Sequence, residues 1–109
     1  NKQKNMLMNW RRTKMYEYLI IDTDGEETHV ESKEKPTLGE MQKAVGGYIE
    51  VVRCLYKDKE KQMIINEEGK LRDLELNEKA TEMFWYFLAG MRIDNIVGKA
   101  MILKNFELD

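Results

Sequence analysis

Residues 48–56, YIEVVRCLY, most limit how this chain can fold. Apolar side chains occupy both alternating sets of positions, which is typical of a β-strand with both faces covered. Gly46 and Gly47 stop a helix before this segment, and the charged loop KDKEK follows it at 57–61. Because β-branched residues resume at 62–66, we expect a hairpin of two strands. The first of these strands, covered on both faces, is expected to be central in the sheet.

Another hairpin is predicted near the N-terminus. Residues 15–21, MYEYLII, are rich in aromatic and β-branched types, and apolar and polar residues alternate on the return at 28–32. Asp24 and Gly25 lie between these segments and form a turn signal, because both tolerate positive φ. This acidic segment lacks the roughly twelve-residue ligand spacing of a calcium-binding loop, so we interpret it as a turn.

Two helices are predicted, each with its own start signal. Thr37, followed three residues later by Glu40, is a capping box, and the glycines at 46–47 end that short helix. Asn77 is a favourable N-cap for the second helix, which Gly90 terminates. Apolar side chains recur along this helix at the spacing of a face packed on a core: Ala80, Met83, Phe84, Phe87 and Leu88.

Residues 96–103, IVGKAMIL, supply a last strand, in which Gly98 marks a bulge or a close backbone approach. A chain of 109 residues fits one domain, since two separate cores would each be marginal. The expected fold class is α+β, with one domain over residues 15–109. We predict a single, mostly antiparallel five-stranded sheet in the order ββαββαβ, with two helices packed on one face.

Charge divides the chain into a basic N-terminal arm and an acidic body. Residues 1–14 hold five basic residues and no acid, whereas residues 15–109 hold 13 basic residues against 20 acids. The arm suits phosphate or an acidic partner, because both contacts are electrostatic. A solvated tail is the other interpretation, since termini are usually poorly ordered. The candidate residues for binding nucleic acid are Lys2, Lys4, Trp10, Arg11, Arg12 and Lys14.

The residue types needed for catalytic or metal chemistry are scarce. Cys54 and His29 are the sole cysteine and histidine, so the chain can form neither an internal disulfide nor a His/Cys metal cluster. We predict no metal, no cofactor and no catalytic residue, because the sequence contains no nucleophile–base pair or phosphate-binding loop. No apolar run approaches the roughly 20 residues that span a bilayer, and no secretory signal is evident. We therefore expect a soluble protein without a membrane segment.

Three segments together resemble one protein family: LGEMQKAVGGYIEVV at 38–52, MIINEEGKLRDLELNEKAT at 63–81, and IVGKAMIL at 96–103. Over about residues 15–104 the chain is similar to the family called domain of unknown function 3846, found in phages, plasmid-bearing microbes and large viruses. The resemblance implies membership of a family that brings no agreed activity, cofactor or catalytic residue. Residues 1–14 lie outside the family pattern.

The family pattern falls on several residues with structural roles as caps or turns. The polar residues without such a role are candidates for ligand binding: Tyr48, Glu50, Asn66, Glu67 and Thr81. Glu50 and Glu67 lie on strands expected to pair, so two carboxylates there would suit acid–base work or a hard cation. Ordinary surface glutamates are the alternative interpretation.

Aromatic side chains surround the second predicted helix. Residues 84–87, FWYF, give it more apolar surface than one sheet face needs. Trp85 and Tyr86 lie beside the core stripe, and we expect them to form a protein interface.

The leading hypothesis is a viral or phage accessory domain, without enzymatic activity, that acts by protein–protein binding. Self-association and virion assembly are included in this hypothesis. One alternative is a nucleic-acid-associated protein that uses the basic arm. The other is a domain that binds or hydrolyses a small ligand at Glu50 and Glu67. The expected location is the cytoplasm of the host cell, or the virion.

Overall fold

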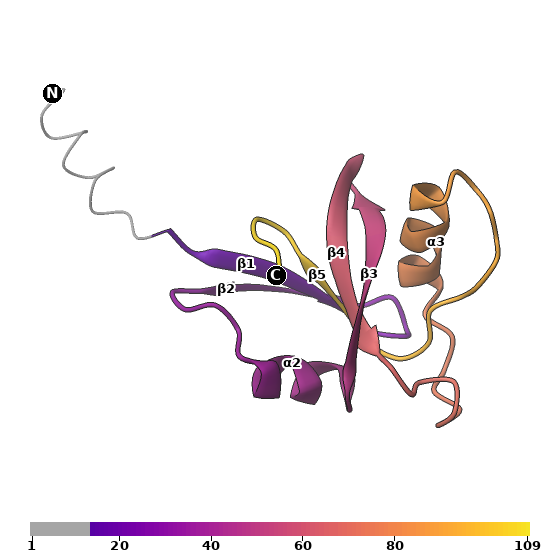
Figure 1. Ribbon diagram of the computed structural model, residues 1–109, viewed down its shortest axis with the longest axis horizontal. Coiled ribbons are helices and arrows are strands. Elements are labelled where there is room, and N and C mark those ends of the chain that lie inside the picture. Colours follow the sequence, from indigo (N-terminus) through magenta and orange to yellow (C-terminus); the bar gives the residue numbers. More distant parts are fainter. Residues whose placement is uncertain (1–13) are drawn as a thin grey trace, which may run out of the picture.

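The computed structural model describes residues 14–109 (Figure 1). Its elements are β1 (Tyr16–Ile21), β2 (Glu27–Ser32), α2 (Leu38–Val45), β3 (Ile49–Tyr56), β4 (Lys59–Asn66), α3 (Glu78–Phe87) and β5 (Ala100–Leu103). The strands form one five-stranded antiparallel sheet in the spatial order β2-β1-β5-β4-β3. The α+β class and the ββαββαβ order are therefore confirmed.

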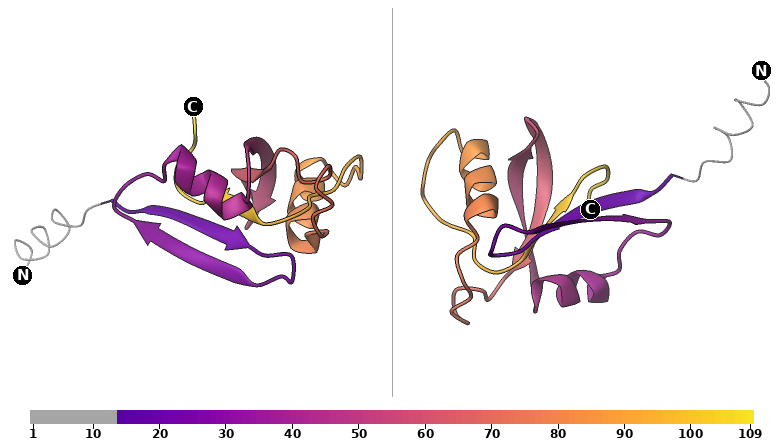
Figure 2. Two further views of the ribbon diagram at one scale, coloured as in Figure 1. Left: turned by 90° about the horizontal axis from the view of Figure 1, so that it is seen from below. Right: turned by 180° about the vertical axis from the view of Figure 1, so that it is seen from behind.

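The two helices lie on opposite faces of the sheet, so the prediction of one shared face was wrong. Ile102 of β5 packs in the cluster that contains Ala80 of α3. Its neighbour Met101 points to the other face and packs with Met41 of α2. Figures 1 and 2 show α2 on one side of the twisted sheet and α3 alongside β3. The inner strands are apolar on both faces, and each face therefore needs its own cover.

β3 is an edge strand, and the prediction that it is central was wrong. The central strand is β5, and all four of its residues are buried. Both faces of β3 are nevertheless covered, because Val52 and Cys54 belong to the cluster under α3 while Ile49 belongs to the cluster under α2. The apolar pattern of residues 48–56 thus reflects cover above and below the strand, not a neighbouring strand on each side.

The β3–β4 hairpin is tighter than predicted. Only Lys57 and Asp58 connect the two strands, with φ angles of 52° and 63°. Residues 59–61, predicted as loop, already belong to β4. A two-residue turn with both φ angles positive matches the right-handed twist of the strands it joins. The charged residues at 57–61 indicated that this segment is exposed to solvent, but they did not indicate how long the loop is.

The predicted starts of both helices and the glycine stop of α2 at Gly46 are confirmed, whereas α3 ends at Phe87, before the predicted stop at Gly90. The Thr37 hydroxyl accepts a hydrogen bond from the Glu40 amide at 3.1 Å, and the Thr37 amide donates to the Glu40 carboxylate at 3.0 Å. The Asn77 side-chain oxygen accepts from the Ala80 amide at 3.1 Å and so caps α3, without the reciprocal bond of a capping box. Gly98 marks a close approach, because a Cβ there would lie 2.7 Å from Leu74. No helix in the described residues is long and apolar enough to cross a membrane.

Candidate functional site

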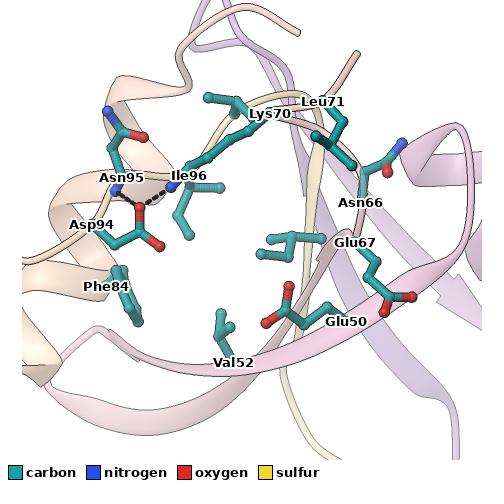
Figure 3. Close-up of a pocket in the computed structure, with 12 residues that line it drawn as sticks. Glu50, Val52, Asn66, Glu67, Lys70, Leu71, Phe84, Asp94, Asn95 and Ile96 are labelled. Atoms are coloured by element: carbon teal, nitrogen blue, oxygen red, sulfur yellow. Dashed lines mark hydrogen bonds and ion pairs between the residues drawn. The ribbon is translucent and has the colours of Figure 1, made fainter. Parts of the chain in front are cut away.

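A pocket of about 140 Å³ opens on the α3 side of the sheet, where β3 begins and β4 ends (Figure 3). Strand β3, the segment after β4, helix α3 and the segment before β5 all contribute to its wall. Its apolar lining includes Val52, Ile65, Phe84 and Ile96. Its charged lining is Glu50, Glu67, Lys70 and Asp94. Three acids and one base around an apolar interior suit a cationic group that also has an apolar portion.

Glu50 and Glu67 line the same pocket, as the predicted hairpin implied. Glu50 is on β3 opposite Ile65, and the Glu67 amide donates to the Tyr48 carbonyl at 2.8 Å. Figure 3 shows the Glu50 carboxylate turned into the pocket and the Glu67 carboxylate pointing away from it. The two side chains therefore share a site without forming a facing pair of the kind used in acid–base hydrolysis.

The side chain of Asn66 is held by the fold. It is buried, its amide nitrogen donates to the Val45 carbonyl at 3.1 Å, and its oxygen accepts from the Glu68 amide at 2.8 Å. These bonds connect the end of α2 to the end of β4. Asn66 therefore lines the pocket while using its polar atoms to shape the pocket wall.

Thr81 and Tyr48 do not line the pocket. Thr81 is buried on α3, and its hydroxyl is bonded to both main-chain polar groups of Ile96, which does line it. Tyr48 precedes β3 and its side chain is exposed. The structure thus brings together Glu50, Asn66 and Glu67 from the predicted set and leaves the other two outside.

The pocket wall opposite Glu67 is formed by Lys70 and Asp94, which were not identified as site residues from the sequence. The Asp94 carboxylate pairs with Lys70 and also accepts the Asn95 amide, while the Asp94 carbonyl accepts from the Trp85 indole. Asp94 stands in an irregular segment between α3 and β5, with no periodic pattern around it. Its bond to Lys70 joins residues 24 apart in the chain, so no local signal could have revealed it.

The two predicted interface aromatics differ in their surroundings. Trp85 is half-buried. Its indole N–H donates to the Asp94 carbonyl, and the Arg92 guanidinium lies 5.0 Å from its ring centroid. Tyr86 is 66% exposed. Met91 and Ile93, in the segment between α3 and β5, are 57% and 71% exposed. We call Tyr86, Met91 and Ile93 the loop surface.

The proposed nucleic-acid residues of the arm, Lys2, Lys4, Trp10, Arg11 and Arg12, lie outside the described residues, and Lys14 is exposed. Among residues 14–109, no group of three or more His, Cys, Asp or Glu side chains is placed to hold a metal ion.

The described part of the chain is thus a small antiparallel α+β domain with a charged pocket beside α3 and exposed apolar side chains after it. A family model described as Domain of unknown function (DUF3846) matches residues 15–107, and the chain belongs to this family. The match covers the whole sheet and both helices. No curated protein and no solved structure matches the chain significantly.

Proposed function

We propose that this domain acts by binding another protein through the loop surface of Tyr86, Met91 and Ile93. The single observation behind the proposal is that three large apolar side chains, all more than half exposed, fall within eight residues of the chain, at the end of α3 and in the segment after it. Exposed apolar clusters on small soluble domains commonly mark contact sites. Tyrosine and methionine are also enriched at protein interfaces.

The loop that carries Met91 and Ile93 is attached to the body of the domain at several points. Asp94 is bonded to Trp85 and Lys70, and Ile96 is bonded to Thr81. A surface held in one conformation loses less conformational entropy on binding than a free loop does. These internal bonds therefore favour a preorganised contact surface and give Trp85 a supporting role, because its indole holds Asp94.

The cellular setting of this proposal comes from the family resemblance. The resemblance implies relatives in phages and large viruses, and we therefore propose the cytoplasm of an infected cell, or the virion, as the place to search for the partner. We propose an accessory role of this kind, with assembly onto another viral or host protein as its outcome.

A pull-down from phage-infected cells tests the proposal. The variant Tyr86→Ser, Ile93→Ser should lose the captured partner while keeping its thermal unfolding temperature, because both side chains are largely exposed. Leu38→Ser is the matched control, since Leu38 is 56% exposed but belongs to α2 on the other face. Capture that survives in the double variant, or is lost equally in the control, would rule out the loop surface.

A second candidate is binding of a small cationic ligand in the pocket. It rests on the Glu50 carboxylate, which turns into a cavity that Phe84 also lines, as an ammonium group beside an aromatic ring would require. Calorimetric titration with choline, arginine and spermidine tests it, with Glu50→Gln as the comparison. Absence of heat from all three ligands in the unmodified protein would end this candidate.

A further inference from the structure

The main chain of β3 presents unused hydrogen-bonding groups at the sheet edge. In an antiparallel ladder, hydrogen-bonded and non-hydrogen-bonded pairs alternate. The Glu67 amide donates to the Tyr48 carbonyl, so Tyr48 and Glu67 are a hydrogen-bonded pair. At the other end of the hairpin, the two-residue turn at 57–58 makes Tyr56 and Lys59 a hydrogen-bonded pair as well. The even-numbered residues of β3 therefore bond to β4. The amide and carbonyl groups of Ile49, Val51 and Arg53 therefore point away from β4, outward from the free edge of the sheet.

The two edges of the sheet differ in chemistry. The Asp22 amide donates to the Glu26 carbonyl, so the even-numbered residues of β2 bond to β1. The amide and carbonyl groups of Glu27, His29 and Glu31 therefore point outward from the β2 edge. Charged side chains along an edge discourage the addition of another strand. On β3 the corresponding residues begin with Ile49 and Val51, and Val51 is 42% exposed. Within residues 14–109, no hydrogen bond reaches the outward groups of β3.

We infer that the β3 edge is a docking site for an extended segment of another protein, which adds to the sheet beside β3. This inference rests on the proposal that the domain binds protein, but it uses a different surface from Tyr86, Met91 and Ile93. In strand addition, main-chain bonds supply affinity and alternate side chains supply specificity.

Charge indicates which segment would fit. Glu68 pairs with Arg72 and Asp94 pairs with Lys70, whereas within residues 14–109 no ion pair involves the carboxylates of Glu50 and Glu67. A docked residue on the α3 side of the sheet would lie beside Glu50, where a lysine or arginine is favoured. Its neighbours would point to the other side, beside Ile49 and Val51. The partner is therefore an extended segment that alternates basic and apolar residues.

A second copy of this chain is a poor occupant of the same edge. Helix α3 packs along β3 itself (Figure 1). Pairing two β3 edges would place the strands about 4.8 Å apart, whereas two packed helices need about 8 to 10 Å between their axes. The two α3 helices would therefore collide. A single extended segment brings no helix with it and avoids that collision.

Hydrogen exchange of the full chain, measured by NMR, tests strand addition directly. The probe is a short synthetic peptide that alternates lysine and valine. Its binding should slow exchange of the Ile49, Val51 and Arg53 amides, which exchange rapidly in the free protein because they point to solvent. Replacing lysine by glutamate in the peptide should abolish the effect. Unchanged exchange at all three amides under saturating peptide, or equal protection by the glutamate peptide, would overturn the inference.

Val51→Pro tests the edge by mutation. Proline removes an amide that makes no bond to β4, so it is tolerated at this position of an edge strand. It should weaken binding of the lysine–valine peptide at least about tenfold, since a main-chain donor is lost and the ring obstructs pairing. His29→Pro makes the same change on the β2 edge and should bind normally. Equal affinity of a folded Val51→Pro variant would overturn the inference, and the exchange test stands if that variant does not fold.

The loop surface and the β3 edge are separable by experiment. Ile93→Ser should lose the pulled-down partner yet still bind the lysine–valine peptide. Val51→Pro should lose the peptide. Loss of peptide binding in Ile93→Ser would mean that the loop, not the strand edge, holds the peptide, and it would contradict the inference without contradicting protein binding.

Discussion

Thr81 and Ile96 exchange two hydrogen bonds: the Thr81 hydroxyl accepts from the Ile96 amide at 2.8 Å and donates to the Ile96 carbonyl at 3.2 Å. Both residues are buried. We predict that Thr81→Val, which keeps the side-chain shape, destabilises the domain by about 1 to 3 kcal/mol, because the buried Ile96 amide loses its partner while the Ile96 carbonyl keeps only its bond from the Asn77 amide. Urea unfolding measures the change. Thr81→Ser keeps the hydroxyl and is the control.

The Thr81 experiment also tests a ligand-binding role. A structural threonine predicts lower stability in Thr81→Val and near-normal stability in Thr81→Ser. A Thr81→Val protein as stable as the unmodified chain would show that the Ile96 bonds contribute little, and would make Thr81 a candidate for ligand binding again.

Gly98 is a second position where the fold imposes a strict requirement. Its φ is +77°, and an added Cβ would lie 2.7 Å from the Leu74 side chain. We predict that Gly98→Ala lowers the free energy of unfolding by about 1 to 3 kcal/mol, since it adds backbone strain to a steric clash. Gly39→Ala is the control, because Gly39 lies in α2 with no atom closer than 3.9 Å to an added Cβ. It should be neutral or stabilising. Equal effects of the two substitutions would contradict the strain at Gly98.

Local chemistry explains which parts of this fold could be predicted from the sequence. Thr37 and Glu40 form their capping box within three residues, and Asn77 caps α3 within its own first turn. Such signals need no knowledge of the rest of the chain. The position of β3 at an edge, by contrast, depends on β5 inserting between β1 and β4, and nothing within residues 48–56 encodes that choice.

The pocket, too, has residues that the sequence predicted and residues that it did not. Glu50 and Glu67 were predicted to lie close together because a hairpin joins their segments, and both line the pocket. Asp94 was missed, since its position depends on a bond to Lys70, 24 residues away in the chain, and on a bond to Trp85 across the irregular segment after α3. The opposite placement of the helices was missed because the apolar pattern of a strand shows that a face is covered, not which element covers it.

Cys54 gives a prediction for alkaline pH. Burial raises the pKa of its thiol to about 12, from an ordinary value of 9.0. The folded state therefore holds the proton more tightly than the unfolded state, and the resulting stability is present below pH 9 and lost between about pH 9 and 12. One such group lowers the unfolding free energy by at most about 1.4 kcal/mol per pH unit in this window.

The measurement is urea unfolding at several alkaline pH values, for the unmodified protein and for Cys54→Ala. The two proteins differ only at this residue, so the difference in slope isolates the thiol. The variant should be less stable at neutral pH, because it loses buried volume, and should lose stability less steeply above pH 9. Parallel curves would show that the Cys54 thiol does not titrate as a buried group.

The basic arm gives the last prediction, which tests nucleic-acid binding. Deletion of residues 1–14 should leave thermal unfolding unchanged, because β1 begins at Tyr16 and Asn105 bonds to the carbonyl of Met15 and the amide of Glu17. If the arm neutralises phosphates, duplex affinity should fall on deletion, and the log–log salt slope should shrink by about 0.9 for each phosphate that the arm had neutralised. Fluorescence anisotropy with a labelled duplex at two salt concentrations measures both. Lys33→Gln, Lys35→Gln removes basic charge from the acidic body instead and should leave the salt slope unchanged. Identical binding curves for the intact and truncated proteins would eliminate a nucleic-acid role for the arm.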